Sequence, residues 1–203
     1  MRFLGSTPKE MIGIYQHLLK VHGTDSPRAL GWGSPLMHNA HHHALTNRIK
    51  PGYSVIDFGC GLGDLHRYLQ KTGLAVHYEG FDQVPELVTA ASKKNPGGHF
   101  SVRNSLEGLG AHSRDYVVAC GVFTYRLVGH EIFLKKNLAD FALVAKRGFA
   151  LDLLALETRS QLAEDYYAID RDNLEQMLKS LGFKFEITTS SLLKHHFVYV
   201  KFA

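Results

Sequence analysis

Short apolar runs alternate along the chain with segments whose apolar residues recur at helical spacing. The runs at 55–58, 75–81, 99–102, 115–120 and 149–155 have the length of buried strands. Helical spacing begins at Leu65 with Tyr68 and Leu69, and it is also found over 85–95, 130–145 and about 170–181. Strands that alternate with helices in this way favour an α/β fold built on a mainly parallel sheet.

Two more helices are predicted ahead of the first strand. Residues 7–10 read Thr-Pro-Lys-Glu, a capping box with proline at the first helical position, and Gly23 marks the end of this helix. A second helix is expected over about 35–49. Residues 1–50 therefore form a predicted helical cap on a core of residues 51–203, and the whole length suits one domain.

The C-terminal segment predicts a change in strand direction. Residues 183–189 and 197–202 both alternate apolar with polar positions, and only a short turn separates them. Strands joined so closely must be antiparallel, whereas a plain dinucleotide-binding sheet continues through another helix. The expected architecture is a Rossmann-like, doubly wound sheet of seven strands, mostly parallel and closed by an antiparallel hairpin.

The sequence Val-Ile-Asp-Phe-Gly-Cys-Gly-Leu-Gly-Asp-Leu at 55–65 carries the clearest functional signal. A strand that ends in glycines and opens a helix can bring its backbone close to a nucleotide. The Gly-Lys-Ser/Thr of a phosphate-binding loop is absent, and the third glycine comes one residue too early for a dinucleotide fingerprint. Asp57 and Asp64 would repel an anion, so the loop suits a ligand with a cationic amino-acid end.

This pattern resembles the first motif of the class I S-adenosylmethionine-dependent methyltransferases, written acidic-x-Gly-x-Gly-x-Gly. Asp82 follows Gly63 by 19 residues at the tip of the second predicted strand, where an acidic residue can bind ribose hydroxyls. The alternative for Asp82 is a helix cap. The C-terminal hairpin is typical of the same family, so the resemblance spans roughly residues 51–203. It implies S-adenosyl-L-methionine as cofactor and S-adenosylhomocysteine as product.

The resemblance also implies which residues contact the cofactor. Asn104 and Ser105 fall where the family usually has an acidic residue for the adenine amino group, and Cys120 and Gly121 fall beneath the sulfonium. Tyr125, like Phe123, either lines the pocket or packs in the core. The full implied set is Asp57, Gly59, Cys60, Gly61, Asp64, Asp82, Gln83, Asn104, Ser105, Cys120 and Gly121.

The catalytic group is not defined by the family, because in-line methyl transfer needs orientation above all and a base only when the acceptor loses a proton. The candidate bases are His38, His42, Tyr125, His130 and His196, with His195 beside the last. His195 and His196 are otherwise expected in a solvated turn. His38 and His42 share a helix face and could bind a metal, but no third ligand lies nearby in the sequence, so no metal is predicted.

The acceptor is expected to be a small molecule. Residues 119–125 read Ala-Cys-Gly-Val-Phe-Thr-Tyr, which lacks both the Asn/Asp-Pro-Pro-Tyr/Phe of amino methyltransferases and the Pro-Cys of C5-cytosine enzymes. This phrase and the glycine loop together look like a microbial branch of the family. The alternatives are an RNA or protein methyltransferase and a non-catalytic cofactor-binding protein. An NAD(P)-linked oxidoreductase is disfavoured by the glycine spacing.

Amino-acid composition limits the partners and the cellular compartment that the sequence allows. The net charge of +4 and the pI near 9.0 permit nucleic-acid binding, but no basic stripe runs along the chain. No apolar run approaches the roughly 18 residues of a membrane span, and the first residues lack a signal-peptide pattern. A cytoplasmic protein with free thiols at Cys60 and Cys120 is expected. The sequence gives no indication of the oligomeric state.

Overall fold

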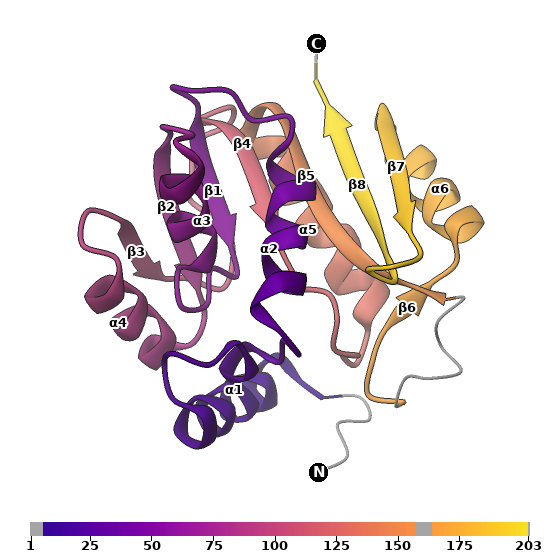
Figure 1. Ribbon diagram of the computed structural model, residues 1–203. Helices are drawn as coiled ribbons and strands as arrows, with labels where there is room; N and C mark the ends of the chain where they lie inside the picture. The colour runs from indigo at the N-terminus through magenta and orange to yellow at the C-terminus, as the bar shows by residue number, and fades with distance from the viewer. Residues whose placement is uncertain (1–5, 157–163, 203) are drawn as a thin grey trace.

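The computed structural model of the protein describes residues 6–156 and 164–202, and one sheet with helices on both faces dominates it (Figure 1). Its strands are β1 (Ser54–Phe58), β2 (His77–Asp82), β3 (His99–Val102), β4 (Arg114–Ala119), β5 (Ala145–Ala155), β6 (Ala168–Ile169), β7 (Phe185–Ser190) and β8 (His195–Lys201). The strand order is β3-β2-β1-β4-β5-β8-β7, with β6 paired to β5. Only β8 runs antiparallel to its neighbours β5 and β7, which confirms the predicted mostly parallel sheet with a closing hairpin.

Helices cover both faces of this sheet. They are α1 (Pro8–His22), η1 (Pro27–Leu30, a 3-10 helix), α2 (Pro35–Thr46), α3 (Asp64–Thr72), α4 (Pro85–Lys94), α5 (His130–Val144) and α6 (Arg171–Ser180). One core cluster joins the sheet to α5 and α6, and another joins its opposite face to α2 and α3. Among these described helices, none combines the length and apolar character that crossing a bilayer requires.

The capping signals in the sequence are confirmed at the atomic level. The Thr7 side chain accepts a hydrogen bond from the Glu10 backbone N–H, and the Glu10 carboxylate accepts one from the Thr7 N–H. Asp170 caps α6 through the backbone N–H of Asn173. Side-chain caps satisfy amide groups that a helix leaves free at its start, which is why the starts were predictable.

The structure differs from the sequence prediction at several boundaries. α2 ends at Thr46 rather than near 49, because the Ile49 N–H donates to the Thr46 carbonyl oxygen and closes a turn instead of continuing the helix. β5 begins at Ala145, ahead of the apolar run at 149–155, because the exposed, charged residues Lys146 and Arg147 interrupt the apolar pattern. β6 brings the described strands to eight, and a two-residue strand leaves no periodic pattern to detect.

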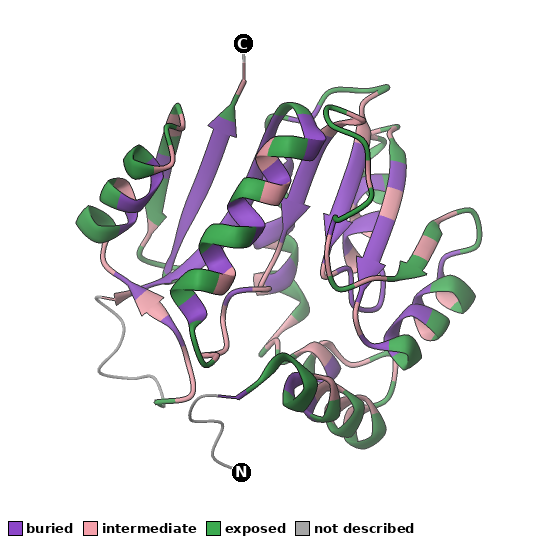
Figure 2. Cartoon of the chain, turned by 180° about the vertical axis from the view of Figure 1, so that it is seen from behind, coloured by how far each residue is buried: buried purple, intermediate pink, exposed green. Residues whose placement is uncertain are grey.

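The C-terminal histidines were placed wrongly by the sequence analysis. His195 and His196 are the first residues of β8 and are buried, not part of a solvated turn. β8 is buried along almost all its length (Figure 2), because β5 and β7 flank it and α2 packs on it. Close packing in this region also requires Gly148 in β5, where a Cβ atom would lie 2.1 Å from the Val200 carbonyl oxygen.

The sheet positions a site where its strand order reverses. β1 is followed in the sheet by β2 on one side and by β4 on the other, so the carboxyl ends of β1 and β4 flank a switch point. α1 packs on η1 and α4 and lies across this end of the sheet, at the bottom of Figure 1. Of the predicted helical cap, α1 and η1 thus lie at the edge at which open α/β sheets bind ligands, whereas α2 packs on a face of the sheet.

Candidate functional site

A cavity of about 270 Å³ opens at the switch point, between the strand ends and the cap. Its lining comes from α1, η1, α2, the glycine loop, the ends of β2 and β4, and the segment before α6. Ten of the eleven predicted cofactor residues line it: Asp57, Gly59, Cys60, Gly61, Asp64, Asp82, Gln83, Asn104, Cys120 and Gly121. The eleventh, Ser105, does not line it, and its carbonyl accepts a hydrogen bond from Arg103.

Asp82 ties the glycine loop to the following strand. Its Oδ2 accepts a hydrogen bond from the Gly61 N–H and its Oδ1 accepts one from the Val84 N–H, both at 2.9 Å. Gly59 and Cys60 donate their backbone N–H groups to the Phe81 carbonyl oxygen. Burial raises the pKa of Asp82, against the opposing effect of these hydrogen bonds. The carboxylate therefore fixes the loop and borders the cavity at the same time.

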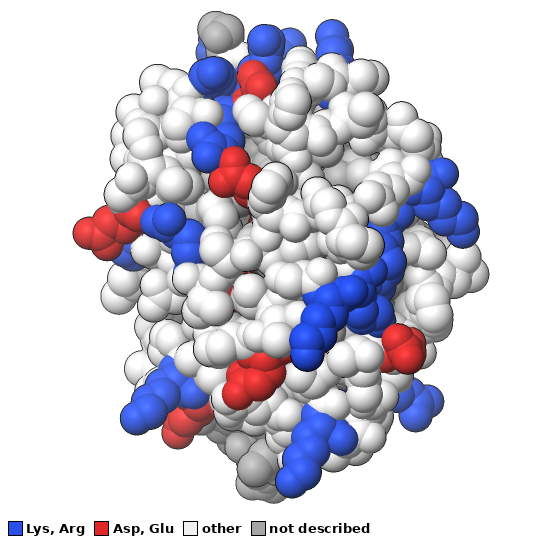
Figure 3. All heavy atoms as spheres, turned by 90° about the vertical axis from the view of Figure 1, so that its left-hand side faces the viewer, with Lys and Arg blue, Asp and Glu red and all other residues white. Residues whose placement is uncertain are grey.

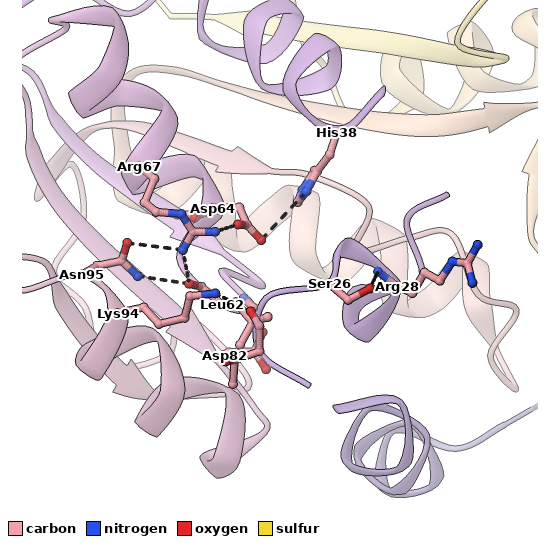
Figure 4. A network of polar contacts seen from close by, with 12 residues as sticks. Ser26, Arg28, His38, Leu62, Asp64, Arg67, Asp82, Lys94 and Asn95 are labelled. Atoms are coloured by element: carbon pink, nitrogen blue, oxygen red, sulfur yellow. Dashed lines mark hydrogen bonds and ion pairs between the residues drawn. The ribbon is translucent and has the colours of Figure 1, made fainter. Parts of the chain in front are cut away.

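The charge of the loop is less exposed than the sequence suggested. Asp57 is buried, accepts a hydrogen bond from the Tyr78 hydroxyl at 2.7 Å, and burial raises its pKa to about 7. Asp64 forms an ion pair with Arg67, one turn further along α3, and its Oδ2 lies 3.9 Å from the His38 Nδ1 (Figure 4). The glycine loop contains no Lys or Arg residue, but Arg67 on α3 places a guanidinium beside Asp64.

Two of the candidate bases lie side by side in the cavity wall. The His38 ring stacks on Trp32 with ring centroids 4.4 Å apart. The centroids of the His38 and His42 rings lie 4.2 Å apart. Burial lowers the pKa of His38 to about 3 and lowers that of His42 well below its usual range. Both side chains are therefore neutral near pH 7. Cys120 lies close to both, although it is far from them in the sequence.

A buried pair behind this wall was missed by the sequence analysis. The His41 Nδ1 lies 2.6 Å from the Asp152 Oδ2, and the Asp152 Oδ1 accepts a hydrogen bond from the Gly121 N–H at 2.7 Å. Burial by itself would raise the pKa of Asp152, but the hydrogen bonds from His41 and Gly121 hold it below its usual range. The available signal was a single carboxylate within an apolar strand, since such a residue needs a buried partner.

Tyrosines form the opposite part of the wall. Tyr125 lines the cavity, stacks on Tyr166 at 5.3 Å between ring centroids, and meets the edge of Tyr15 at 6.1 Å. Phe123, by contrast, is fully buried in the core. Tyr166 also lines the cavity and lies in the segment between β5 and β6, of which residues 157–163 lie outside the described residues.

Of the remaining candidate bases, His130 and His196 do not line the cavity, whereas His195 does. His130 is buried against the ring of Tyr167, with centroids 3.8 Å apart, and accepts a hydrogen bond from the Leu127 N–H. His196 is fully buried, with its two ring nitrogens at hydrogen-bond distance from Thr189 and Ile169. His195 does line the cavity, edge-on to His41.

The fold and this site define a class I S-adenosylmethionine-dependent methyltransferase, and the chain belongs to that family. It is 30% identical over 135 residues to the "Putative methyltransferase Rv1506c" of Mycobacterium tuberculosis, an alignment that covers 62% of this chain and 78% of that protein. No family model matches the chain.

Solved methyltransferase structures have the same fold. Magnesium protoporphyrin IX methyltransferase from Synechocystis PCC 6803, with bound SAH, superposes with a TM-score of 0.66 at 17% identity and covers 95% of this chain and 99% of its own. A SAM-dependent methyltransferase from Aquifex aeolicus gives 0.65 at 20% identity, over 93% and 98% of the two chains.

Proposed function

We propose that this protein binds S-adenosyl-L-methionine in the cavity and transfers its methyl group to an oxygen or nitrogen atom of a small molecule. The observation that carries the proposal is the placement of the glycine loop and Asp82 together in one cavity at the switch point. The Synechocystis relative in fold was solved with SAH and also with SAM bound, which supports the same ligand here.

The predicted contacts follow the cavity from one end to the other. The loop from Gly59 to Gly61 holds the methionine part, and Asp82 with Gln83 holds the ribose. Asn104 receives the adenine amino group through its side-chain oxygen. Cys120 and Gly121, directly after β4, lie beneath the sulfonium. Residues 1–203 act as one domain in which the cap of residues 1–50 covers the cofactor.

Transfer itself is an in-line displacement, so the protein has to orient the acceptor and exclude water. Residues of α1 and η1 line the cavity, which serves the exclusion of water. His38 and His42 are neutral but weakly basic, because burial lowers the pKa of each. They suit an acceptor that already has a free lone pair or that loses its proton easily.

The walls favour a small acceptor with a flat apolar part. Tyr15, Trp32, Tyr125 and Tyr166 provide aromatic surface on more than one side of the cavity. Aromatic rings favour stacked or edge contacts with planar partners. On the face shown in Figure 3, Lys and Arg side chains stand among acidic and uncharged residues. An RNA acceptor is the second candidate, supported by the pI near 9.0.

Calorimetry with S-adenosylhomocysteine tests the cofactor assignment directly. We expect one binding site per chain, and an Asp82→Ala variant that binds at least tenfold more weakly. Transfer of radiolabelled methyl from the cofactor to a metabolite extract, compared with total RNA and with protein, then tests the acceptor class. Labelling of RNA with a steep salt dependence would replace the small-molecule proposal by its alternative. No binding of either cofactor form would refute both.

A further inference from the structure

We propose that His38, His42 and Cys120 form a binding site for a zinc ion. His38 and His42 stand one turn apart on α2, and Cys120 follows β4 directly. One possible ligand atom from each of the three residues lies within 4.8 Å of the others. Sequence analysis predicted no metal because it found no third ligand near the histidines, and the fold supplies one from 78 residues away.

The donor set selects the metal. Two imidazole nitrogens and one thiolate are ligands that Zn²⁺ prefers, whereas Mg²⁺ and Ca²⁺ require oxygen ligands. Zn²⁺ holds such ligands at about 2.0–2.3 Å in a tetrahedron, so the three donor atoms, which lie within 4.8 Å of one another, draw closer when they converge on one ion. Formation of the Zn–S bond releases the Cys120 thiol proton to solvent.

The hydrogen bonding of the three residues leaves them available as ligands. His42 is 2% exposed, and its Nδ1 has no hydrogen-bond partner among the described residues. A buried polar atom without a partner is costly and calls for an explanation, which a bound metal would provide. His38 stacks its ring face on Trp32, which leaves its nitrogens free in the ring plane, and its contact with Asp64 is 3.9 Å long.

A second group of possible ligands, His41, Cys120 and Asp152, overlaps the first at Cys120. His41 and Asp152 are already committed to each other at 2.6 Å, and Asp152 also holds the Gly121 N–H. These two residues are therefore better suited to fix the backbone next to Cys120. Hydrogen bonds around the direct ligands of a metal orient those ligands in many sites.

The position of the site gives the ion an open coordination place. All three ligands line the cavity, so a three-coordinate protein site leaves its fourth position facing the cavity interior. If methyl transfer occurs there as proposed above, a hydroxyl of the acceptor can take that position and lose its proton more easily. This last step rests on the proposed function, whereas metal binding does not.

Cobalt titration of the metal-free protein tests the site without measuring activity. We expect one equivalent of Co²⁺ to bind, to produce a thiolate-to-cobalt charge-transfer band, and to be displaced by one equivalent of Zn²⁺. Cys120→Ser should abolish the band, and His42→Ala should weaken Co²⁺ binding at least tenfold. His43→Ala is the matched control, because His43 is exposed on the same helix and should titrate like the wild type.

Calorimetry with S-adenosylhomocysteine on the same samples separates the two proposals. A wild-type protein that binds S-adenosylhomocysteine but neither Co²⁺ nor Zn²⁺ would overturn the metal site, whatever the variants do. Retention of the charge-transfer band in Cys120→Ser would overturn it as well. A protein that binds zinc with the expected variant pattern but no S-adenosylhomocysteine would refute the proposed function and leave the metal site standing.

Discussion

Gly59 and Gly73 offer a matched test of how the glycine loop works. Both have left-handed backbone conformations, with φ of 78° and 73°. A Cβ atom on Gly59 would lie 2.5 Å from the Val122 Cγ2, whereas a Cβ atom on Gly73 would meet nothing within 4 Å. Alanine at either position therefore has the same backbone cost, and only Gly59→Ala forces a neighbour to move.

The expected magnitudes follow from these two terms. A left-handed conformation costs alanine roughly 1–2 kcal/mol, so Gly73→Ala should lower the free energy of unfolding by about that amount. Displacing a packed side chain adds roughly 1–3 kcal/mol, which brings Gly59→Ala to about 2–5 kcal/mol. Val122 also lines the cavity, so its displacement should weaken S-adenosylhomocysteine binding at least tenfold in Gly59→Ala alone.

Urea unfolding followed by circular dichroism and calorimetry with S-adenosylhomocysteine provide the two readouts. Equal destabilisation of both variants would show that the contact with Val122 adds nothing to the backbone cost. A Gly59→Ala variant that folds and binds S-adenosylhomocysteine as tightly as Gly73→Ala does would refute the placement of the cofactor against this loop.

Three further substitutions are expected to have measurable effects. Asp82→Ala should weaken S-adenosylhomocysteine binding by at least about 1.4 kcal/mol, or tenfold, in calorimetry; an unchanged Kd would remove Asp82 from the cofactor site. The pKa of Asp57 is raised to about 7 in the folded protein, so the folded state holds this proton more tightly than the unfolded chain. As the pH rises from about 4 to 7, this group therefore lowers the free energy of unfolding by up to about 1.4 kcal/mol per pH unit. Asp57→Asn should remove this contribution, so that the urea midpoint depends less on pH over that range. Asp152→Asn should cost about 3 kcal/mol in urea unfolding because it weakens a buried pair with His41, and a loss below about 1 kcal/mol would contradict this account.

The sequence predicted the fold well because local signals and the fold agree. Caps at Thr7 and Asp170 mark helix starts, and periodicity distinguishes strands from helices. Errors arose where local pattern and tertiary packing differ. His195 and His196 have the polarity of a turn, yet β8 carries them into the interior between two strands.

Most of the predicted cofactor residues line the cavity, but the contacts between distant segments around them were not predicted. Asp57, the glycines and Asp82 follow one another at spacings that the backbone geometry of a strand-loop-helix unit imposes. The pairs His41–Asp152 and Asp64–Arg67 were not foreseen. The first joins residues 111 positions apart and depends on how α2 lies on the sheet, which no local spacing encodes. The second lies within one helical turn and was open to prediction from charge spacing.

The antiparallel insertion of β8 imposes an order on the assembly of the site during synthesis. β8 follows the seven other described strands in the sequence, yet it lies between β5 and β7 and faces α2 through His195 and Phe197. While β8 remains inside the ribosome, one edge of β5 is unpaired, and the His41–Asp152 pair lacks the packing that His195 and Phe197 provide. The glycine loop can form early, but the part of the candidate site's cavity wall that His195 provides cannot form until β8 has been released.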